Sequence, residues 1–306
     1  MTTILSALAP VFLLILIGWA ARSRDLVSME AFGSVNRFGY FVLYPAFLFS
    51  TVAGAKVETA DAGPFVAAVM LGFLTMCGLA LLSKPAFKPD HGPAFTSFFQ
   101  GVGRWNGFAL LAAADSLFGP DGKGLLALAF GPVVLMVNVL CVAVLARWGT
   151  KATTSKRAIV DQILANPLIL ACAAGLTWRL TGWEFAGPPA DTLKLLSNAA
   201  MPIALLCVGA GIDLKAARAG GAALAGGVGL KLLVAPMVLY ASALALGVGP
   251  LGAAVAAGIG STPTAAAAYT LAREMGGDAK LMAAIVSVTT LASFLTMPLV
   301  LILTAP

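Results

Sequence analysis

The chain has 306 residues, of which 60% are hydrophobic and only 10% are charged, and its mean hydropathy is +0.96. A soluble globular domain carries about 25% charged residues, so this composition cannot coat a water-exposed surface and excludes a soluble protein. The net charge is +6, but the basic residues are scattered over short segments, which argues against a nucleic-acid-binding protein.

Apolar stretches of roughly 20 residues follow one another along the chain, and this is the length that crosses a bilayer core as a helix. Ten spans are expected, at about 3–21, 31–54, 63–83, 93–117, 122–147, 159–181, 190–212, 218–246, 250–274 and 279–304. The segments between them are too short to hold a soluble domain. The sequence therefore predicts an all-α membrane protein with ten transmembrane helices, embedded in the lipid bilayer.

Lys and Arg are unevenly divided between the two sets of loops. The loops after the odd-numbered spans carry twelve of them, whereas the loops on the other side carry three, Lys56, Lys123 and Arg179. Because basic loops stay in the cytoplasm, both termini of this multi-pass protein are expected on the non-cytoplasmic side. The first ten residues carry no Lys or Arg, so the N-terminus does not resemble a cleaved signal peptide.

A shift of 157 residues superimposes the second half of the sequence on the first without a gap. Eight of the sixteen glycines in residues 1–149 then meet a glycine, and Pro45 meets Pro202. Each half holds five spans, an odd number, so the second half must enter the membrane from the opposite side. This predicts two inverted five-helix repeats, 1–149 and 158–306, joined by a cytoplasmic linker at 150–157, which is a plan common among secondary transporters.

The fourth and ninth spans each contain two glycines followed by a helix-start signal, at equivalent positions of the two repeats. The glycines are Gly101 and Gly103 in one span and Gly258 and Gly260 in the other. Asn106 is expected to cap the second half of the fourth helix, whereas Thr262 caps the second half of the ninth and Pro263 takes its first helical position. The broken helices 4 and 9 are predicted to cross at the membrane midplane, where unwound backbone lines a cavity. The alternative is a pair of packing kinks built from small residues.

Half-helix N-termini at such a crossing carry free N–H groups and partial positive charge, which favour an anion. Arg104 lies at the break of the fourth span and Lys231 in the middle of the eighth, and charges inside the membrane usually mark function. No Asp or Glu lies near either break, so a carboxylate-bearing substrate is expected. The alternatives are a snorkelling side chain or a structural hydrogen bond to exposed carbonyls.

Further residues around the breaks are candidates for hydrogen bonds to the substrate. The complete candidate set is Asn106, Arg104, Thr262, Pro263, Thr264, Asn138, Ser50 and Gln100. The neutral members of this set could equally serve helix packing. Lys231 is a candidate coupling residue or a fixed counter-ion, and the sequence leaves the choice between these two roles open.

No motif for catalysis is found in the chain. There is no nucleophile–base pairing, no phosphate-cradling loop and no metal-ligand spacing, so an enzyme, a cofactor and a metal site are not expected. Cys77, Cys141, Cys172 and Cys207 all fall inside expected spans and are interpreted as small apolar packing residues. His91 lies in an expected cytoplasmic loop and is interpreted as solvated.

The order and spacing of several short motifs are similar to those of a known family. Asn166-Pro167 followed by Gly175, Pro202 with Gly209 and Gly211, Lys231 with Pro236, and the stretch from Ser261 to Tyr269 resemble the auxin efflux carrier family. That family includes plant PIN proteins and bacterial malonate and malate permeases. The resemblance covers essentially the whole chain, without the long cytoplasmic loop of the plant proteins.

The resemblance implies a bacterial inner (plasma) membrane protein with two moving parts. Helices 1, 2, 6 and 7 would form a scaffold that makes a homodimer, and helices 3–5 and 8–10 a transport domain that moves as an elevator. Asn106 and Pro263 match the crossover asparagine and proline of the family, and Asn138 lies near a polar position of the fifth helix. Arg104-Trp105 stands where the family has a proline, so the resemblance implies a substrate other than auxin.

The leading hypothesis is a secondary transporter for a small organic anion, a mono- or dicarboxylate, with no obvious sodium site. The first alternative is a sodium-coupled organic anion symporter that resembles the bile acid transporter group, whose members use acidic residues near the crossing to bind sodium. The second alternative is a membrane sensor that binds a ligand without moving it. Flux measured with and without a sodium gradient separates the first two hypotheses, and saturable ligand binding without flux would indicate the sensor.

Overall fold

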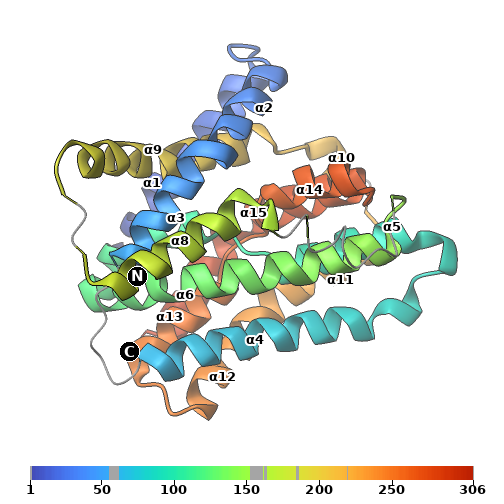
Figure 1. Cartoon of the computed structure of the whole chain (residues 1–306). Coiled ribbons are helices and arrows are strands. Elements are labelled where there is room, and N and C mark those ends of the chain that lie inside the picture. Colours follow the sequence, from blue (N-terminus) through green and yellow to red (C-terminus); the bar gives the residue numbers. More distant parts are fainter. Residues whose placement is uncertain are drawn as a thin grey trace.

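The computed structural model describes residues 2–54, 62–151, 161, 164–183, 186–218 and 220–305. All regular secondary structure in these ranges is helical (Figure 1), which confirms the all-α prediction. Of the predicted linker at 150–157, only Thr150 and Lys151 fall among the described residues, and the rest lies outside them together with the loop residue Lys56.

The first half of the chain contains helices of very different length. They are α1 (Thr2–Ser23), α2 (Met29–Phe38) continued by the π-helical turn η1 (Gly39–Leu43) and α3 (Tyr44–Ala53), α4 (Ala62–Leu82), the short 3-10 turns η2 (Lys84–Ala86) and η3 (Pro89–His91), α5 (Gly92–Gly103) and α6 (Gly107–Trp148). The long α6 is bent at Gly119, whose φ of 68° and ψ of −174° are not helical. The kink falls between two expected spans, so α6 contains the end of one and the whole of the next.

The second half has a similar sequence of long, interrupted and broken helices. They are α8 (Pro167–Thr181), α9 (Pro188–Ala210), α10 (Leu214–Arg218), α11 (Ala222–Gly229) continued by the π-helical turn η4 (Leu230–Val234) and α12 (Ala235–Ala245), α13 (Pro250–Ser261), α14 (Ala267–Met275) and α15 (Ala279–Leu303). Local chemistry sets several starts: the Asn166 side chain accepts hydrogen bonds from the backbone of α8, and Asp278 does the same for α15.

Within the described residues, six helical stretches are long and apolar enough to cross a membrane. They are Ile4–Ser23, Ala62–Ala86, Gly92–Trp148, Pro188–Ala210, Ala222–Ala245 and Ala279–Leu303. Gly92–Trp148 has 57 residues, more than twice the length that one crossing needs, whereas the apolar helices Pro167–Thr181 and Pro250–Ser261 are shorter than a full crossing. The number of ten transmembrane helices remains a prediction.

Two close helix pairs are held together at glycines. A Cβ at Gly18 of α1 would overlap the carbonyl of Leu206 in α9, and a Cβ at Gly175 of α8 would lie 3.0 Å from the carbonyl of Phe49 in α3. Small residues let helix backbones approach in this way where lipid surrounds them. Gly18 and Gly175 are 157 positions apart, and so are Phe49 and Leu206, so the two contacts join equivalent positions of the sequence repeat.

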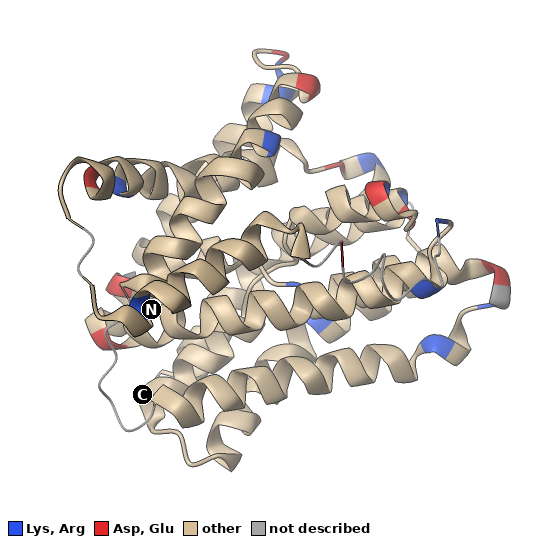
Figure 2. Ribbon diagram, viewed as in Figure 1, with Lys and Arg blue, Asp and Glu red and all other residues tan. Residues whose placement is uncertain are grey.

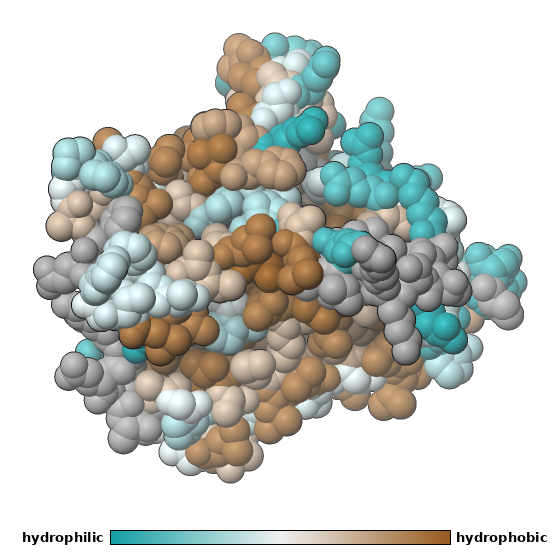
Figure 3. All heavy atoms as spheres, viewed as in Figure 1, coloured by the Kyte–Doolittle hydropathy of each residue, from teal (hydrophilic) through white to brown (hydrophobic). Residues whose placement is uncertain are grey.

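The outer surface is apolar along the helices and charged near their ends. Lys, Arg, Asp and Glu gather near helix ends and loops, with long uncharged stretches between them (Figure 2). Large apolar side chains lie open on the outside, among them Leu13, Met237 and Leu295, which are 56%, 70% and 79% exposed. Hydrophobic atoms cover much of the face that Figure 3 shows. Such a surface suits a bilayer and would be insoluble in water.

Candidate functional site

Two helix breaks lie against each other in the interior of the protein. One separates α5, which ends at Gly103, from α6, which begins at Gly107, and the other separates α13 from α14. The backbone N–H of Asn106 donates a 2.8 Å hydrogen bond to the carbonyl of Pro263. The Thr264 hydroxyl donates a 2.7 Å bond to the carbonyl of Gly101. The two unwound segments, 104–106 and 262–266, thus satisfy each other's backbone groups, and we call them the paired breaks.

The glycines that drew attention to these breaks lie in the last turns of α5 and α13, and the chain unwinds after them. A Cβ at Gly101 would meet Ile285 at 2.8 Å, and a Cβ at Gly260 would lie 2.6 Å from the Pro236 backbone. Gly103 and Gly258 are similarly close to the Cys77 sulfur and the Phe118 ring. Close packing therefore explains the glycines, whereas the unwinding itself begins at Arg104 and Thr262.

The prediction of helix caps is right at one break and wrong at the other. Asn106 is the N-cap residue of α6, although its side chain makes no capping hydrogen bond. Thr262 instead follows the end of α13, where its hydroxyl donates back to the carbonyl of Ile259 at 2.8 Å. Pro263 does not begin α14, whose N-cap is Ala266. The carbonyl of Pro263 accepts the bond from Asn106, and α14 begins only at Ala267.

A threonine on α15 supports the second break, and the sequence interpretation missed it. The backbone N–H of Thr264 donates to the hydroxyl of Thr289 at 3.2 Å, and both side chains are fully buried. Thr290 and Ser293 are buried nearby on the same helix. Hydroxyl residues at this spacing within an apolar helix were the available signal, but nothing local indicated which helix they would face.

Arg104 is buried beside the first break and is held by a residue far along the chain. Its side chain is 8% exposed, and its Nη2 donates a 2.6 Å hydrogen bond to Oδ1 of Asn138 on α6. The structure therefore brings these two predicted site residues together. The Nε of Arg104 has no hydrogen-bond partner within the described residues. Nη2 of the guanidinium group is thus anchored, and Nε is left free to donate.

The segment from Gln100 to Asn106 carries a surplus of buried hydrogen-bond donors. Arg104 Nε, Trp105 Nε1, Asn106 Nδ2 and Gln100 Nε2 are all buried without a partner among the described residues, against a single acceptor, Gln100 Oε1. An unsatisfied buried polar group costs about 1–3 kcal/mol. Four such donors in seven residues could donate to a group rich in hydrogen-bond acceptors, such as a carboxylate.

Lys231 lies on the π-helical turn η4. Its side chain is fully buried, and its Nζ donates no hydrogen bond to any of the described residues. The nearest aromatic group is Phe73, with 5.6 Å between Nζ and the ring centroid, and the Phe73 ring centroid lies 6.0 Å from that of Trp105. π-Helical turns occur frequently at functional sites. Lys231 is therefore separated from the donor-rich segment by one aromatic ring.

Comparison with known proteins identifies the family. The sequence matches the family described as "Membrane transport protein", the auxin efflux carriers, over residues 3–301. The chain belongs to the auxin efflux carrier family. It is also 26% identical over 311 residues to a protein of Rhizobium meliloti (strain 1021) named "Putative malonate transporter", with 97% of this chain and 94% of that protein covered. This member of the family is a multi-pass membrane transporter and not an enzyme.

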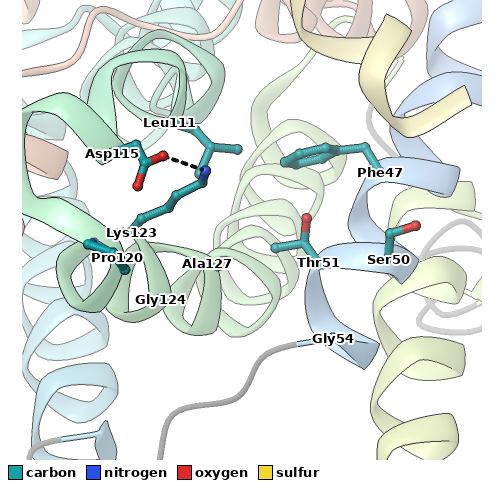
Figure 4. Close-up of a pocket in the computed structure, with 10 residues that line it drawn as sticks. All are labelled: Phe47, Ser50, Thr51, Gly54, Leu111, Asp115, Pro120, Lys123, Gly124 and Ala127. Atoms are coloured by element: carbon teal, nitrogen blue, oxygen red, sulfur yellow. Dashed lines mark hydrogen bonds and ion pairs between the residues drawn. The ribbon is translucent and has the colours of Figure 1, made fainter. Parts of the chain in front are cut away.

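One predicted site residue of this family member lies apart from the paired breaks. Ser50 lines a separate pocket of about 460 Å³ between α3 and the kink of α6, together with Thr51, Asp115 and Lys123 (Figure 4). The remaining candidates, Gln100, Arg104, Asn106, Asn138, Thr262, Pro263 and Thr264, all lie at the paired breaks or bond to them. The structure therefore divides the predicted set between two places.

The cysteines of this auxin efflux carrier relative are free thiols inside the helices. Cys77, Cys141, Cys172 and Cys207 are all buried, which agrees with packing roles. Within the described residues no group of three or more His, Cys, Asp or Glu side chains could hold a metal ion. The side chains of His91 and Asp90 lie 3.8 Å apart and are more than half exposed, as expected for a solvated loop.

Proposed function

We propose that this chain is a secondary transporter for a small organic anion, a carboxylate, that binds at the paired breaks. The observation that carries the proposal is the donor surplus from Gln100 to Asn106, with an anchored but incompletely satisfied guanidinium group at its centre. An arginine fork matches a carboxylate with two parallel hydrogen bonds. The α6 helix begins beside it, and its N-terminus adds N–H groups and partial positive charge.

The proposed architecture is ten transmembrane helices in two inverted repeats, 1–149 and 158–306, with the breaks crossing at the membrane midplane. Residues near a pseudo-two-fold axis contact their own counterparts, and Asn106 bonds to Pro263, the residue 157 positions later. The matching contacts of Gly18 with Leu206 and of Gly175 with Phe49 support the same relation. Inverted repeats place the substrate between equivalent halves and allow alternating access around it.

The proposed motion is of the elevator type, between a scaffold and a transport domain. The scaffold would consist of α1, α2, α3, α8 and α9, in which Gly18 and Gly175 each pack against the backbone of a neighbouring helix. The transport domain would consist of α4–α6 and α10–α15, in which Gly72 packs on Leu239 and Gly260 on Pro236. Each group of helices is closely packed within itself, and an elevator motion requires this because each group must move as a rigid body. A homodimer through the scaffold helices is part of this proposal.

The substrate class follows from the site and from the relative together. The R. meliloti protein carries a name for malonate transport, and malonate is a short dicarboxylate with four acceptor oxygens. Arg104 would bind one carboxylate, and the amides of Gln100 and Asn106 would add hydrogen bonds. Lys231 supplies a second buried positive charge near the site, so a dianion would not leave net charge uncompensated.

Among the described residues, no Asp or Glu side chain bonds to the paired breaks, which is why we propose transport without a sodium site. The ion pairs among the described residues, His91 with Asp90 and Lys123 with Asp115, both involve exposed side chains. Backbone carbonyls alone can hold sodium, so the bile acid transporter type of symport is the alternative. Uptake that collapses when the sodium gradient is removed would favour the alternative.

The test is uptake by purified protein in liposomes. Labelled malonate and a panel of mono- and dicarboxylates should accumulate or exchange, and Asn106→Ala should abolish this. Asn198→Ala on the exposed side of α9 is the matched control and should leave uptake unchanged. Movement of a cation or neutral solute with no carboxylate moving would contradict the proposal. Saturable carboxylate binding without flux would instead support a sensor.

A further inference from the structure

The pocket that contains Ser50 is polar on two sides and lies between helices that we assign to different domains. It is lined by the last turn and C-cap of α3, with Phe47, Ser50, Thr51 and Gly54, and by both arms of the kinked α6. Asp115 comes from the arm before the kink and Lys123 from the arm after it (Figure 4). At about 460 Å³ the pocket is large enough for a small organic acid.

The kink at Gly119 is what creates the charged side of this pocket. In a straight α-helix, residues eight positions apart are separated by about 12 Å along the axis. The non-helical Gly119, with φ of 68°, folds the helix so that Lys123 Nζ lies 3.4 Å from Asp115 Oδ2. A side chain at position 119 would be strained in this conformation. The Lys123 ammonium is 48% exposed and the Asp115 carboxylate 61% exposed, so water or a solute reaches the pair.

The opposite side of the pocket offers two free hydroxyl groups. Ser50 and Thr51 have no side-chain hydrogen bond within the described residues, whereas Thr75 and Thr177 in other helices donate to the carbonyl four residues earlier. Such back-bonding is the usual way for a helical hydroxyl to be satisfied when it faces an apolar environment. In Figure 4 the Thr51 side chain stands across the pocket from Lys123, whereas the Ser50 hydroxyl points away from Lys123. Thr51, and Ser50 after a change of its χ1 rotamer, can therefore add hydrogen-bond donors beside the Lys123 cation.

Aromatic rings form the boundary between this pocket and the paired breaks. Phe47 lines the pocket, and its ring centroid lies 5.0 Å from that of Phe108 and 5.6 Å from that of Phe130. The Phe130 centroid lies 4.9 Å from that of Trp105, the neighbour of Arg104. Contacting aromatic rings therefore connect the pocket to the donor-rich segment.

We propose that this pocket is an entry subsite for the same carboxylate substrate, in which the substrate's carboxylate displaces Asp115 from Lys123 and accepts hydrogen bonds from Ser50 and Thr51. The inference rests on the proposed function, because it takes the substrate at the paired breaks to be an anion. The Asp115 carboxylate holds Lys123 in place when the pocket is free of substrate and competes with the substrate for it. On the expected orientation of the chain, the pocket opens on the non-cytoplasmic side.

The kinetic test compares charge variants of the pair in liposomes, with labelled malonate as the probe. Lys123→Gln should raise KM about two- to fivefold, the effect of one half-exposed ion pair, and leave kcat within error. Asp115→Asn should lower KM because it removes the competitor. Lys194→Gln, an exposed lysine of α9, is the control and should change neither constant. An unchanged KM in both pocket variants would overturn the subsite.

Cysteine labelling tests the subsite independently of the charge variants, in case one of them folds poorly. Ser50→Cys should react with a membrane-impermeant, charged methanethiosulfonate reagent, because position 50 lines the pocket. The four native cysteines are buried and should not react, so the labelling reports on position 50 alone. Malonate should slow this reaction in proportion to its concentration, also when Asn106→Ala is present and transport is absent. Labelling that malonate does not slow would overturn the subsite. Loss of uptake in Asn106→Ala, in contrast, tests only the site at the paired breaks, so the two proposals can fail separately.

Discussion

The N–H of Asn106 donates to the carbonyl of Pro263 across 2.8 Å, although the two residues are 157 positions apart in the chain. The same interval relates the two halves of the sequence. A hydrogen bond between equivalent residues is what an axis between inverted repeats would produce. It also has an energetic role, since unwound backbone away from water needs a partner and each break provides one for the other. The breaks are therefore a single structural unit.

Asn106 offers a way to separate binding from stability. Asn106→Asp keeps an excellent N-cap residue at the start of α6 and places a negative charge at a helix N-terminus, which stabilises a helix by about 0.3–1 kcal/mol. The same charge should repel an anionic substrate and abolish uptake. Thermal unfolding in detergent should therefore show an unchanged or higher Tm, whereas uptake into liposomes disappears. Asn198→Asp is the control, and retained malonate uptake in Asn106→Asp would contradict an anion site here.

Arg104 should respond to changes in the residue that anchors it. Asn138→Asp would replace a neutral acceptor 2.6 Å from Nη2 with a carboxylate, which neutralises the guanidinium charge in competition with the substrate. We expect carboxylate binding to weaken at least tenfold, by about 1.4 kcal/mol or more, while the protein remains folded. Asn138→Leu removes the anchor without adding charge and should weaken binding less. Malonate binding is measured by thermal shift. If Asn138→Asp and Asn138→Leu weakened binding equally, the charge of Arg104 would not contribute to malonate binding.

At Lys231, a substitution is expected to keep or raise stability while it removes transport. Its ammonium is fully buried without a hydrogen-bond partner among the described residues, so Lys231→Met, which keeps the volume, should leave Tm unchanged or raise it. Lys231→Ala leaves a cavity, so it should lower the free energy of unfolding by about 2–5 kcal/mol and lower Tm. Both variants should lose malonate uptake if the charge acts as counter-ion or coupling group. Full uptake in Lys231→Met would assign the lysine to neither role.

The sequence predicted the elements of the site better than their detailed geometry. The sequence predicted where the breaks lie, because Gly101 and Gly103 recur 157 residues later as Gly258 and Gly260. The residue that starts α14 was not, because the bond from Asn106 to the Pro263 carbonyl and the return of the Thr262 hydroxyl to Ile259 are set by the fold. The hydrogen bond between Arg104 and Asn138 joins residues 34 positions apart, so it cannot be predicted from a local sequence pattern.

The position of Ser50 illustrates the same limit. Its type and depth suggested a hydrogen-bonding residue at the breaks, but it lines a separate pocket. Which helix it faces depends on the rotation of α3 after the π-helical turn η1 and on the bend of α6 at Gly119. Both are departures from regular helix geometry, and a pattern with a period of 3.6 residues cannot register them.

The scaffold pairs give a test that does not depend on the substrate. At Gly18 a Cβ would overlap the Leu206 carbonyl, and at Gly175 it would lie 3.0 Å from the Phe49 carbonyl. Neither backbone can yield as a side-chain tip would. Gly18→Ala and Gly175→Ala should each destabilise the protein by about 1–3 kcal/mol, with the larger effect at Gly18, and each should lower Tm.

Gly78 of α4 supplies the matched control, since a Cβ there meets nothing within 4 Å. Gly78→Ala should be neutral or stabilising by up to about 1 kcal/mol, because alanine loses less backbone entropy on folding than glycine does. Thermal unfolding of the three variants in one detergent gives the comparison. If Gly18→Ala and Gly78→Ala unfolded at the same temperature, α1 and α9 would not pack backbone to backbone, and the equivalence of this pair with α3 and α8 would lose its support.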